Sequence, residues 1–325
     1  RRLACPHQDI HPKGSPIAAL IAAKEALSII GNHWIAGKIH CACIEPDKKR
    51  FAHLTQAVQP FNTDPRIIIH LYNSSFIAGL ECLRIDASSL FGNQYPRFIF
   101  VDPFGATGVP FQIVRDLLNS PCSEVLINLD ADGIIRIHRA DQAADAAVLL
   151  NAIFGSDIWK GVLAERLSFD ALCYRVLDLY RKLLRDLPQV KYVFPFEMRA
   201  RANTLNYFLV FAAQHYLGLE KMKESMKRID QSGAYCFSDA NIDQQRLFRF
   251  DDVITSSKLL YEAYKGESAS YEELRDYALN DTPFINPKDM LTQLEQDNLI
   301  EVTSSDPKRR RFTFNEDKIK SIKFL

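Results

Sequence analysis

Short apolar runs alternate with amphipathic stretches through the first 130 residues of the chain. Four of these runs have the length and the β-branched content of buried strands. They are residues 38–44 (KIHCACI), 66–72 (RIIIHLY), 97–101 (RFIFV) and 124–129 (EVLINL). The stretches between them have helical patterns. Because strands that are joined through helices run parallel, the pattern predicts an α/β sheet with helices on both faces.

A helical insert and an antiparallel pair of strands are expected next. Residues 138–187 are amphipathic, with the clearest 3.6-residue period at 167–184. Residues 191–199 (KYVFPFEMR) and 206–212 (NYFLVFA) have strand patterns, and the connection between them is short enough for a hairpin. A parallel sheet that ends in an antiparallel hairpin is the order found in Rossmann-like methyltransferase folds. We therefore expect such a domain over residues 1–250.

Residues 251–325 have a different pattern and are assigned to a second domain. Three short helices and two short strands are expected, at residues 256–264, 270–278, 287–297, 299–302 and 311–314. Three helices followed by a β-wing are typical of a winged helix-turn-helix domain.

Polar residues end the first two predicted strands. Nucleotide-binding sheets place a carboxylate at this edge, where it accepts hydrogen bonds from ribose hydroxyls. Glu45 stands at that point, and Asn73 follows the next strand at the same level. We therefore expect Glu45 to hold a ribose and Asn73 to face an adenine edge. The alternatives are a solvated glutamate and an ordinary turn asparagine.

Residues 102–105 (DPFG), after the predicted central strand, are the most distinctive motif. They resemble the Asp/Asn-Pro-Pro-aromatic motif of amino-group methyltransferases. In that motif the side-chain oxygen and a backbone carbonyl accept hydrogen bonds from the target NH2, and the aromatic ring stacks on a flipped base. We therefore expect Asp102, Pro103 and Phe104 to form the catalytic part of the site, with Asp102 and Glu45 in one pocket. One proline of the motif is missing, and a strand-to-helix turn capped by Asp102 is the alternative.

Six segments within residues 14–226 together resemble one family. They are GSPIAAL, CIEPDKKRFAHL, FIFVDPFGATGVP, EVLINL, FGSDIWKG and NYFLVFAAQHYLGLEKMKESM. They are similar to the three-Cys-motif partner protein (TcmP) family of bacteria. The resemblance implies a methyltransferase-like fold, S-adenosylmethionine as the cofactor, and a three-cysteine, radical-SAM-like protein as the partner. It also implies that Gly14 and Ser15 lie beside the cofactor, since the family's glycine loop (DxFAGPG) stands just before them.

Residues 1–13 (RRLACPHQDIHPK) contain neither that loop nor a strand pattern, because they hold two prolines and four charged residues. In a methyltransferase-like sheet a strand lies between those that end at Glu45 and Asp102. Without it, two columns of backbone groups would be unpaired. We therefore expect a further strand and glycine loop just before Gly14, outside the printed residues. We expect the next helix to start with Ser15 as its N-cap and Pro16 in its first turn.

Lys and Arg together number 40, as do Asp and Glu, so the formal net charge is zero. This argues against a protein whose whole surface is basic and binds nucleic acid, but a local basic patch remains possible. Lys308, Arg309, Arg310 and Arg311 on the predicted wing are candidates for phosphate contacts. Residues 253–325 hold 11 basic and 13 acidic residues, a net charge of −2, and the third helix is acidic. Protein docking and wing-only contact with nucleic acid are therefore both open.

No apolar run reaches the roughly 18 to 20 residues of a membrane span, and no signal peptide opens the chain. We therefore expect a cytoplasmic protein with no membrane contact. Seven cysteines without a CxxC pair are expected to be buried free thiols. The chain is thus predicted to be an S-adenosylmethionine-dependent methyltransferase-like protein that acts on or binds nucleic acid. The alternative is a non-catalytic methyltransferase-like module that binds nucleic acid or protein.

Overall fold

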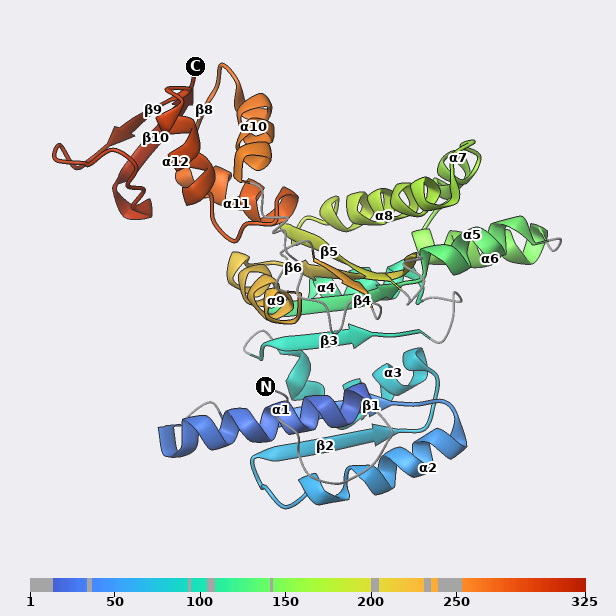
Figure 1. The fold of residues 1–325 in the computed structure, drawn as a ribbon. Coiled ribbons are helices and arrows are strands. Elements are labelled where there is room, and N and C mark those ends of the chain that lie inside the picture. The colour runs from blue at the N-terminus through green and yellow to red at the C-terminus, as the bar shows by residue number, and fades with distance from the viewer. Residues whose placement is uncertain are drawn as a thin grey trace. The chain divides into compact units, whose positions relative to one another are not determined.

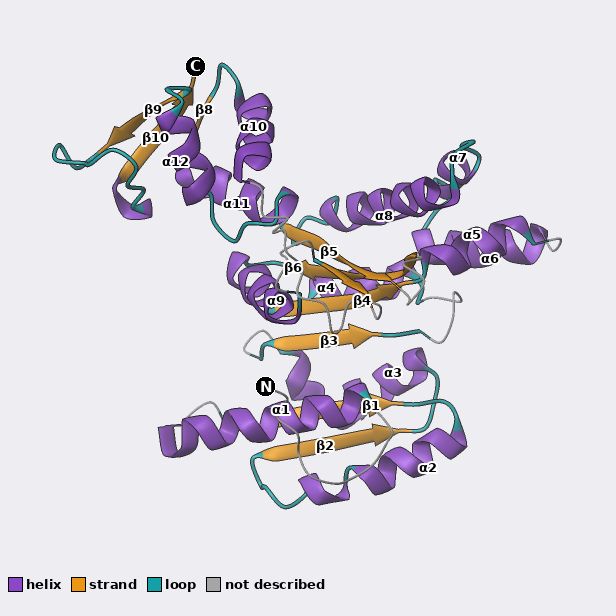
Figure 2. Cartoon of the chain, viewed as in Figure 1, coloured by secondary structure: helices purple, strands orange, loops and turns teal. Residues whose placement is uncertain are grey.

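The computed structural model describes residues 14–33, 37–92, 95–103, 109–140, 143–199, 205–230, 235–238 and 253–325. The chain forms two compact units, residues 1–92 and 93–325. Helices and strands are mixed in both units, which confirms the predicted α/β class (Figure 1, Figure 2). Residues 239–252, where the predicted domain boundary falls, lie outside the described residues.

The first unit is built on two parallel strands. Its elements are α1 (Ser15–Ile30), β1 (Ile39–Ile44), α2 (Lys48–Ala57), β2 (Ile67–Tyr72) and α3 (Phe76–Asp86). Helices α1 and α2 pack on one face of the strands around Leu20 and Leu27. Helix α3 covers the other face and approaches it closely, because a Cβ at Gly79 would lie only 2.6 Å from Ile44 Cγ2. The predicted parallel pairing of these strands is confirmed.

Helix α1 starts one residue earlier than predicted. Gly14 is the N-cap, and its carbonyl accepts hydrogen bonds from the N–H groups of Ile17 and Ala18, both at 3.1 Å. Ser15 is therefore the first helical residue and not the cap, so that prediction was wrong. Proline lacks an N–H group that the first turn would leave unpaired in any case. Pro16 therefore fits the second helical position as well as the first.

The second unit contains a five-stranded sheet in the order β3-β4-β6-β5-β7. Its elements up to this sheet's last strand are β3 (Arg97–Val101), α4 (Phe111–Asn119), β4 (Ser123–Leu129), α5 (Ala131–Arg139), α6 (Ala143–Phe154), α7 (Trp159–Leu163), α8 (Phe169–Arg185), β5 (Tyr192–Arg199), β6 (Leu205–Ala213), α9 (Tyr216–Ile229) and β7 (Cys236–Ser238). Strands β3 and β4 are parallel, while β6 is antiparallel to both β4 and β5, which confirms the predicted hairpin. The carboxyl ends of β3, β4 and β5 therefore share one edge of the sheet. Helix α9 covers one face, and α5 and α8 cover the other (Figure 1).

The C-terminal part of this unit has its own small core. It contains α10 (Val253–Tyr264), β8 (Ser268–Ala269), α11 (Tyr271–Asp281), α12 (Lys288–Gln296), β9 (Ile300–Ser304) and β10 (Ile319–Phe324). The three strands form a sheet in the order β8-β10-β9, and side chains such as Leu274, Leu291 and Phe324 fill the core. The three predicted helices are confirmed.

The predicted strand at residues 311–314 was wrong, since β10 pairs with β9 instead. Phe312 has a φ of 65°, in the left-handed region that an extended strand cannot use. Arg309 and Arg311 also turn back toward α12, as described below. The two-residue strand β8 was missed because it is too short to show an alternating pattern.

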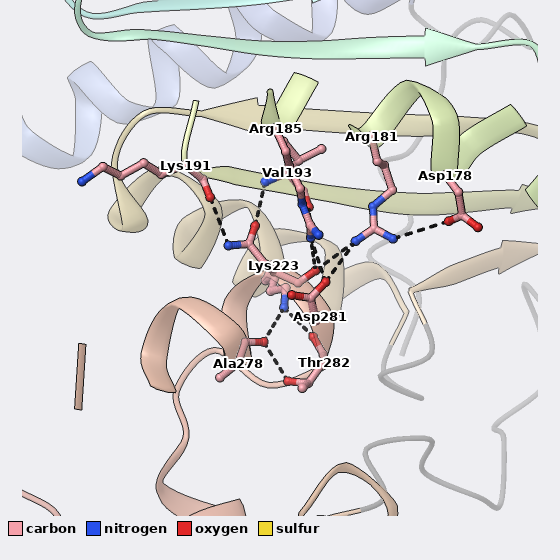
Figure 3. A network of polar contacts seen from close by, with 10 residues as sticks. Asp178, Arg181, Arg185, Lys191, Val193, Lys223, Ala278, Asp281 and Thr282 are labelled. Carbon is pink, nitrogen blue, oxygen red and sulfur yellow. Dashed lines mark hydrogen bonds and ion pairs between the residues drawn. The ribbon is translucent and has the colours of Figure 1, made fainter. Parts of the chain in front are cut away.

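A buried lysine joins α9 to the end of α11. Lys223 is 0% exposed and donates hydrogen bonds to the carbonyls of Ala278 (3.3 Å) and Thr282 (2.6 Å) (Figure 3). It also donates one to the carbonyl of Phe284 (3.1 Å). These carbonyls lie at the C-terminus of α11, where a helix leaves acceptors unpaired. The ammonium group therefore satisfies three backbone acceptors at once.

Helix α8 adds a second set of contacts to the same place. Arg181 and Arg185 both donate hydrogen bonds to the Asn280 carbonyl and form ion pairs with Asp281 (Figure 3). The Asn280 side chain accepts a hydrogen bond from the Val193 N–H at 2.8 Å. Helix α11 is therefore fastened to α8, α9 and β5, and the C-terminal part is built onto the five-stranded sheet.

None of the helices in the described residues is long and apolar enough to span a membrane. The six described cysteines are free thiols, as predicted, but only Cys173 is fully buried, while Cys82 and Cys122 are exposed. Burial raises the pKa of the Cys173 thiol to about 12, with help from nearby aspartates, so this thiol is inert at neutral pH.

Candidate functional site

Asp102 lies at the carboxyl edge of the five-stranded sheet and is held there by β4. It directly follows β3 and is exposed. Val101 of β3 pairs with Ile127 of β4, so the residues that follow them, Asp102 and Asn128, lie side by side. Asn128 Nδ2 donates a hydrogen bond to Asp102 Oδ1 at 2.7 Å. Asp102 is not a helix cap, since the N-cap of α4 is Pro110. The carboxylate is therefore available at the place where α/β sheets bind ligands.

A pocket opens at the same edge. It is small, with room for about one water molecule. Pro103, Asn128, Asp130 and Tyr180 line it together with apolar side chains, and none of its described lining residues is a lysine or arginine. Asp130 caps α5 by accepting a hydrogen bond from the Gly133 N–H at 2.8 Å. The predicted site residue Phe104 lies outside the described residues, so its stacking role stays a prediction.

Asn128 was not among the predicted site residues. Its amide nitrogen must face Asp102, because an ionised carboxylate can only accept hydrogen bonds. Its Oδ1 atom therefore faces away from Asp102, and this atom is buried with no donor near it in the described part of the chain. The sequence did contain a signal, since Asn128 is the polar residue that interrupts the apolar end of EVLINL. A buried acceptor in this position needs a donor, and a buried water molecule is the simplest one.

Glu45 and Asn73 are brought together in the first unit, as the sequence predicts. They lie at the carboxyl ends of β1 and β2, where Glu45 is half-buried and Asn73 is exposed. Asn73 Nδ2 donates hydrogen bonds to the carbonyls of Glu45 (2.8 Å) and Pro46 (3.2 Å), while Glu45 Oε1 accepts one from the Asp47 N–H at 2.9 Å. Asn73 therefore fastens the loop that carries Glu45. Within the described residues, the second Glu45 oxygen and the Asn73 side-chain oxygen remain as acceptors.

The predicted cofactor residues all belong to the first unit, while Asp102 and Pro103 belong to the second. Gly14 and Ser15 lie at the N-terminus of α1. The common pocket of Glu45 and Asp102 stays a prediction.

A second polar cluster lies at the same sheet edge as Asp102, at the end of β5. The Tyr174 hydroxyl of α8 donates a hydrogen bond to Glu197 Oε2 at 2.6 Å, and Arg199 forms an ion pair with Glu197. Burial, together with the Glu197 carboxylate, raises the pKa of Tyr174 to about 12. The charges of Glu197 and Arg199 compensate one another, so this cluster has no net charge with which to bind an ion.

The described residues contain no group of three or more His, Cys, Asp or Glu side chains arranged for a metal ion. His40 and His70 come closest, with Nδ1 of the first 3.0 Å from Nε2 of the second. Burial lowers the pKa of both rings, and for His40 the neighbouring His70 adds to this. A neutral pair that shares one proton accounts for this contact.

The four basic residues of the predicted wing divide into two pairs. Arg309 forms two hydrogen bonds with the Glu295 carboxylate (2.8 and 3.0 Å), and Arg311 donates to the Glu295 carbonyl at 2.7 Å. Lys308 and Arg310 are exposed. Glu295 is only 6% exposed, so it adds no charge to the outer surface of α12, contrary to the expectation from sequence. Arg311 is exposed as well, but its guanidinium already donates to α12, so Lys308 and Arg310 are the better candidates for phosphate contacts.

We expect the charge-reversed variant Lys308→Glu/Arg310→Glu to bind a DNA duplex more weakly than the wild type. Each phosphate contact contributes a slope of about −0.9 to log K against log salt, so the slope should fall in magnitude by about 2. Fluorescence anisotropy at several salt concentrations measures it. Lys320→Glu/Lys323→Glu, with the same charge change on β10, is the control. Equal weakening by both double variants would show that the effect is general charge and not the wing.

No family model, curated protein or solved structure matches the chain. The resemblance to the TcmP family stays an expectation from the sequence segments alone.

Proposed function

We propose that this chain is an S-adenosylmethionine-dependent methyltransferase-like protein whose methyl acceptor is an amino group of a nucleic acid. The observation that carries the proposal is the Asp102 carboxylate, fixed by Asn128 at the carboxyl edge of the sheet. A carboxylate in this position accepts a hydrogen bond from the amino group, which aims the nitrogen lone pair, and it can accept the proton that the nitrogen loses.

The strand arrangement within each unit supports a methyltransferase-type sheet. The first unit has two parallel strands that end at Glu45 and Asn73, and the second has a parallel pair followed by an antiparallel hairpin. Strand β6 lies between β4 and β5, as a hairpin added at the end of such a sheet requires. Strands β1 and β3 each have one side without a strand partner in the described residues. A further strand beside them stays a prediction.

The residues present in the first unit fit parts of S-adenosylmethionine. Glu45 keeps a carboxylate oxygen for a ribose hydroxyl, and Asn73 keeps its side-chain oxygen for an adenine N–H, while its amide nitrogen is already used. The N-terminus of α1 at Gly14 and Ser15 favours a carboxylate. The cofactor would supply a methyl group on a sulfonium. These residues would only bind and orient it.

The C-terminal part supports nucleic acid as the partner. Three helices and a three-stranded sheet are the elements of a winged helix-turn-helix domain. Because α12 carries few basic residues, contact through Lys308 and Arg310 fits better than base reading by α12. The three-cysteine, radical-SAM-like partner stays an expectation from the family resemblance.

The alternative is a non-catalytic methyltransferase-like module that binds nucleic acid or protein. The use of the Asn73 amide nitrogen in two backbone hydrogen bonds favours it, because this group is then unavailable to a cofactor. Binding of the cofactor product separates the two functions.

We expect Asp102→Ala and Glu45→Ala to have opposite effects. Asp102→Ala should lower the rate of methyl transfer at least about 100-fold with little change in affinity for S-adenosylhomocysteine. Glu45→Ala should weaken that affinity by about tenfold or more, since it removes charge-assisted hydrogen bonds. Radioactive methyl transfer to single-stranded DNA or RNA, and calorimetry, measure the two effects. Asp102→Asn, which keeps an acceptor of the same shape, should retain more activity than Asp102→Ala. Equal loss of cofactor binding in both alanine variants would contradict separate roles.

A further inference from the structure

The C-terminal part is attached at the amino edge of the five-stranded sheet, where β3, β4 and β5 begin. Tyr192 is the first residue of β5, and its hydroxyl donates a hydrogen bond to Asp276 Oδ1 of α11 at 2.7 Å. The Asn280 side chain of the same helix forms hydrogen bonds with the backbone of Lys191 (3.1 Å) and Val193 (2.8 Å). Helix α11 therefore lies along the beginning of β5.

The base of the predicted wing lies at this amino edge as well. Strand β6 runs back to the edge, so α9 begins there with Tyr216. The guanidinium carbon of Arg275 lies 4.0 Å from the centre of the Tyr216 ring, and the same guanidinium forms an ion pair with Glu316, just before β10. Within the second unit, the loop between β9 and β10 lies on the side away from the arrowhead of β3 (Figure 1). Lys308 and Arg310 belong to this loop.

Asp102 lies at the opposite, carboxyl edge of the same sheet, and the strand register gives its separation from the attachment. Asn128, beside Asp102, pairs with Leu209, which pairs in turn with Phe196 of β5. Phe196 comes four residues after Tyr192, which is about 13 Å along the strand. Strand β3 lies three strand spacings, about 14 Å, from β5. The direct distance from the start of β5 to Asp102 is therefore about 19 Å.

The attachment also fixes this separation. The end of α11 is held by the buried ammonium group of Lys223 and by the ion pairs of Arg181 and Arg185 with Asp281. The wing cannot be moved toward Asp102 without breaking these contacts. A short nucleic acid that is bound at the wing therefore stays away from the Asp102 of its own chain.

We propose that one nucleic-acid strand binds this chain at two points on opposite edges of the sheet, with its phosphates at Lys308 and Arg310 and one base at Asp102. This proposal rests on the proposed function and deepens it, because it makes the length of the nucleic acid a determinant of substrate choice. A strand that reaches both points has at least about six nucleotides, at about 3.4 Å for each stacked nucleotide. Two linked contacts bind more tightly than either one alone, because the second contact forms at a high effective concentration.

The test is fluorescence anisotropy of the full chain with single-stranded oligodeoxycytidylates of about 4 and about 24 nucleotides. Saturating cytidine, which carries no phosphate, should fill the Asp102 edge and weaken binding of the longer strand at least about tenfold. Binding of the shorter strand at the wing should weaken less than about twofold, because this strand is too short to reach Asp102. In Lys308→Glu/Arg310→Glu the longer strand keeps only its contact at Asp102, so cytidine should displace it completely. The control Lys320→Glu/Lys323→Glu should respond to cytidine as the wild type does.

Two results would overturn the proposal. Equal weakening of both strands by cytidine would show that the wing and Asp102 form a single site. No effect of cytidine on the longer strand would show that a strand bound at the wing does not reach Asp102. In either case, binding of S-adenosylhomocysteine by the wild type would leave the proposed function standing, while its failure to bind would count against both.

Discussion

Replacing Lys223 with methionine should lower the free energy of unfolding by about 3 kcal/mol. The ammonium group donates to three carbonyls at the end of α11. In the variant, the Ala278 carbonyl still accepts a hydrogen bond from the Thr282 hydroxyl at 2.7 Å. The carbonyls of Thr282 and Phe284 lose the hydrogen bond from Lys223. Burial lowers the pKa of Lys223 well below its usual value, while Asp281 opposes this. Removing the buried charge therefore offsets part of the loss.

The matched control is Lys221→Met, on the same helix. Lys221 is exposed and pairs with Glu224 at 2.9 Å, a surface contact that is typically worth less than about 1 kcal/mol. Urea unfolding followed by circular dichroism gives both values. A cost for Lys223→Met no larger than that for Lys221→Met would show that α11 is held by its apolar contacts alone.

Replacing Glu295 with alanine should cost a similar amount, about 3 kcal/mol. Glu295 accepts two hydrogen bonds from Arg309 and one from the Phe312 N–H at 2.7 Å. Both charged side chains are largely buried, with exposures of 13% for Arg309 and 8% for Glu295. Alanine would leave the Arg309 guanidinium buried without its partner and release the segment between β9 and β10 from α12.

The same ion pair predicts a pH dependence. Burial opposes ionisation of Glu295, but the hydrogen bonds from Arg309 and Phe312 outweigh it, so the pKa of Glu295 is lowered. A lowered carboxyl pKa stabilises the fold above the unfolded-state value of about 4.3, and this contribution is lost as the pH falls through the folded-state pKa. Wild type should therefore lose more stability than Glu295→Ala on acidification below about pH 4.3. Glu301→Ala, at an exposed position of β9, is the control and should lose stability with acid as the wild type does. If Glu295→Ala lost as much stability on acidification as the wild type, the account would be contradicted.

Most strands were predictable because their signal is local. Runs such as RIIIHLY and RFIFV combine β-branched or aromatic residues with buried positions, and β2 and β3 lie there. The end of a parallel strand also fixes where its next residue lies, so Glu45, Asn73 and Asp102 could be assigned to strand ends from the sequence alone.

The missed features depend on partners that are distant along the chain. Glu295 counted among the acidic residues of the third predicted helix, because nothing in its own helix indicates that Arg309 would cover it. Lys223 has the spacing of a surface lysine, and only the end of α11 makes it a buried donor. Asn128 resembles a tolerated polar residue until β3 brings Asp102 beside it. Register and tertiary contacts, and not propensity, decide these three positions.

The most direct test of the central claim is a calorimetric titration of the full chain with S-adenosylhomocysteine. We expect binding at one site per chain, and we expect Glu45→Ala to weaken it while Asp102→Ala does not. Saturable binding with this pattern is the result that a cofactor site at Glu45 requires. The absence of binding heat over a temperature range, with a folded wild-type chain, would contradict the methyltransferase proposal and leave the non-catalytic binding module in its place.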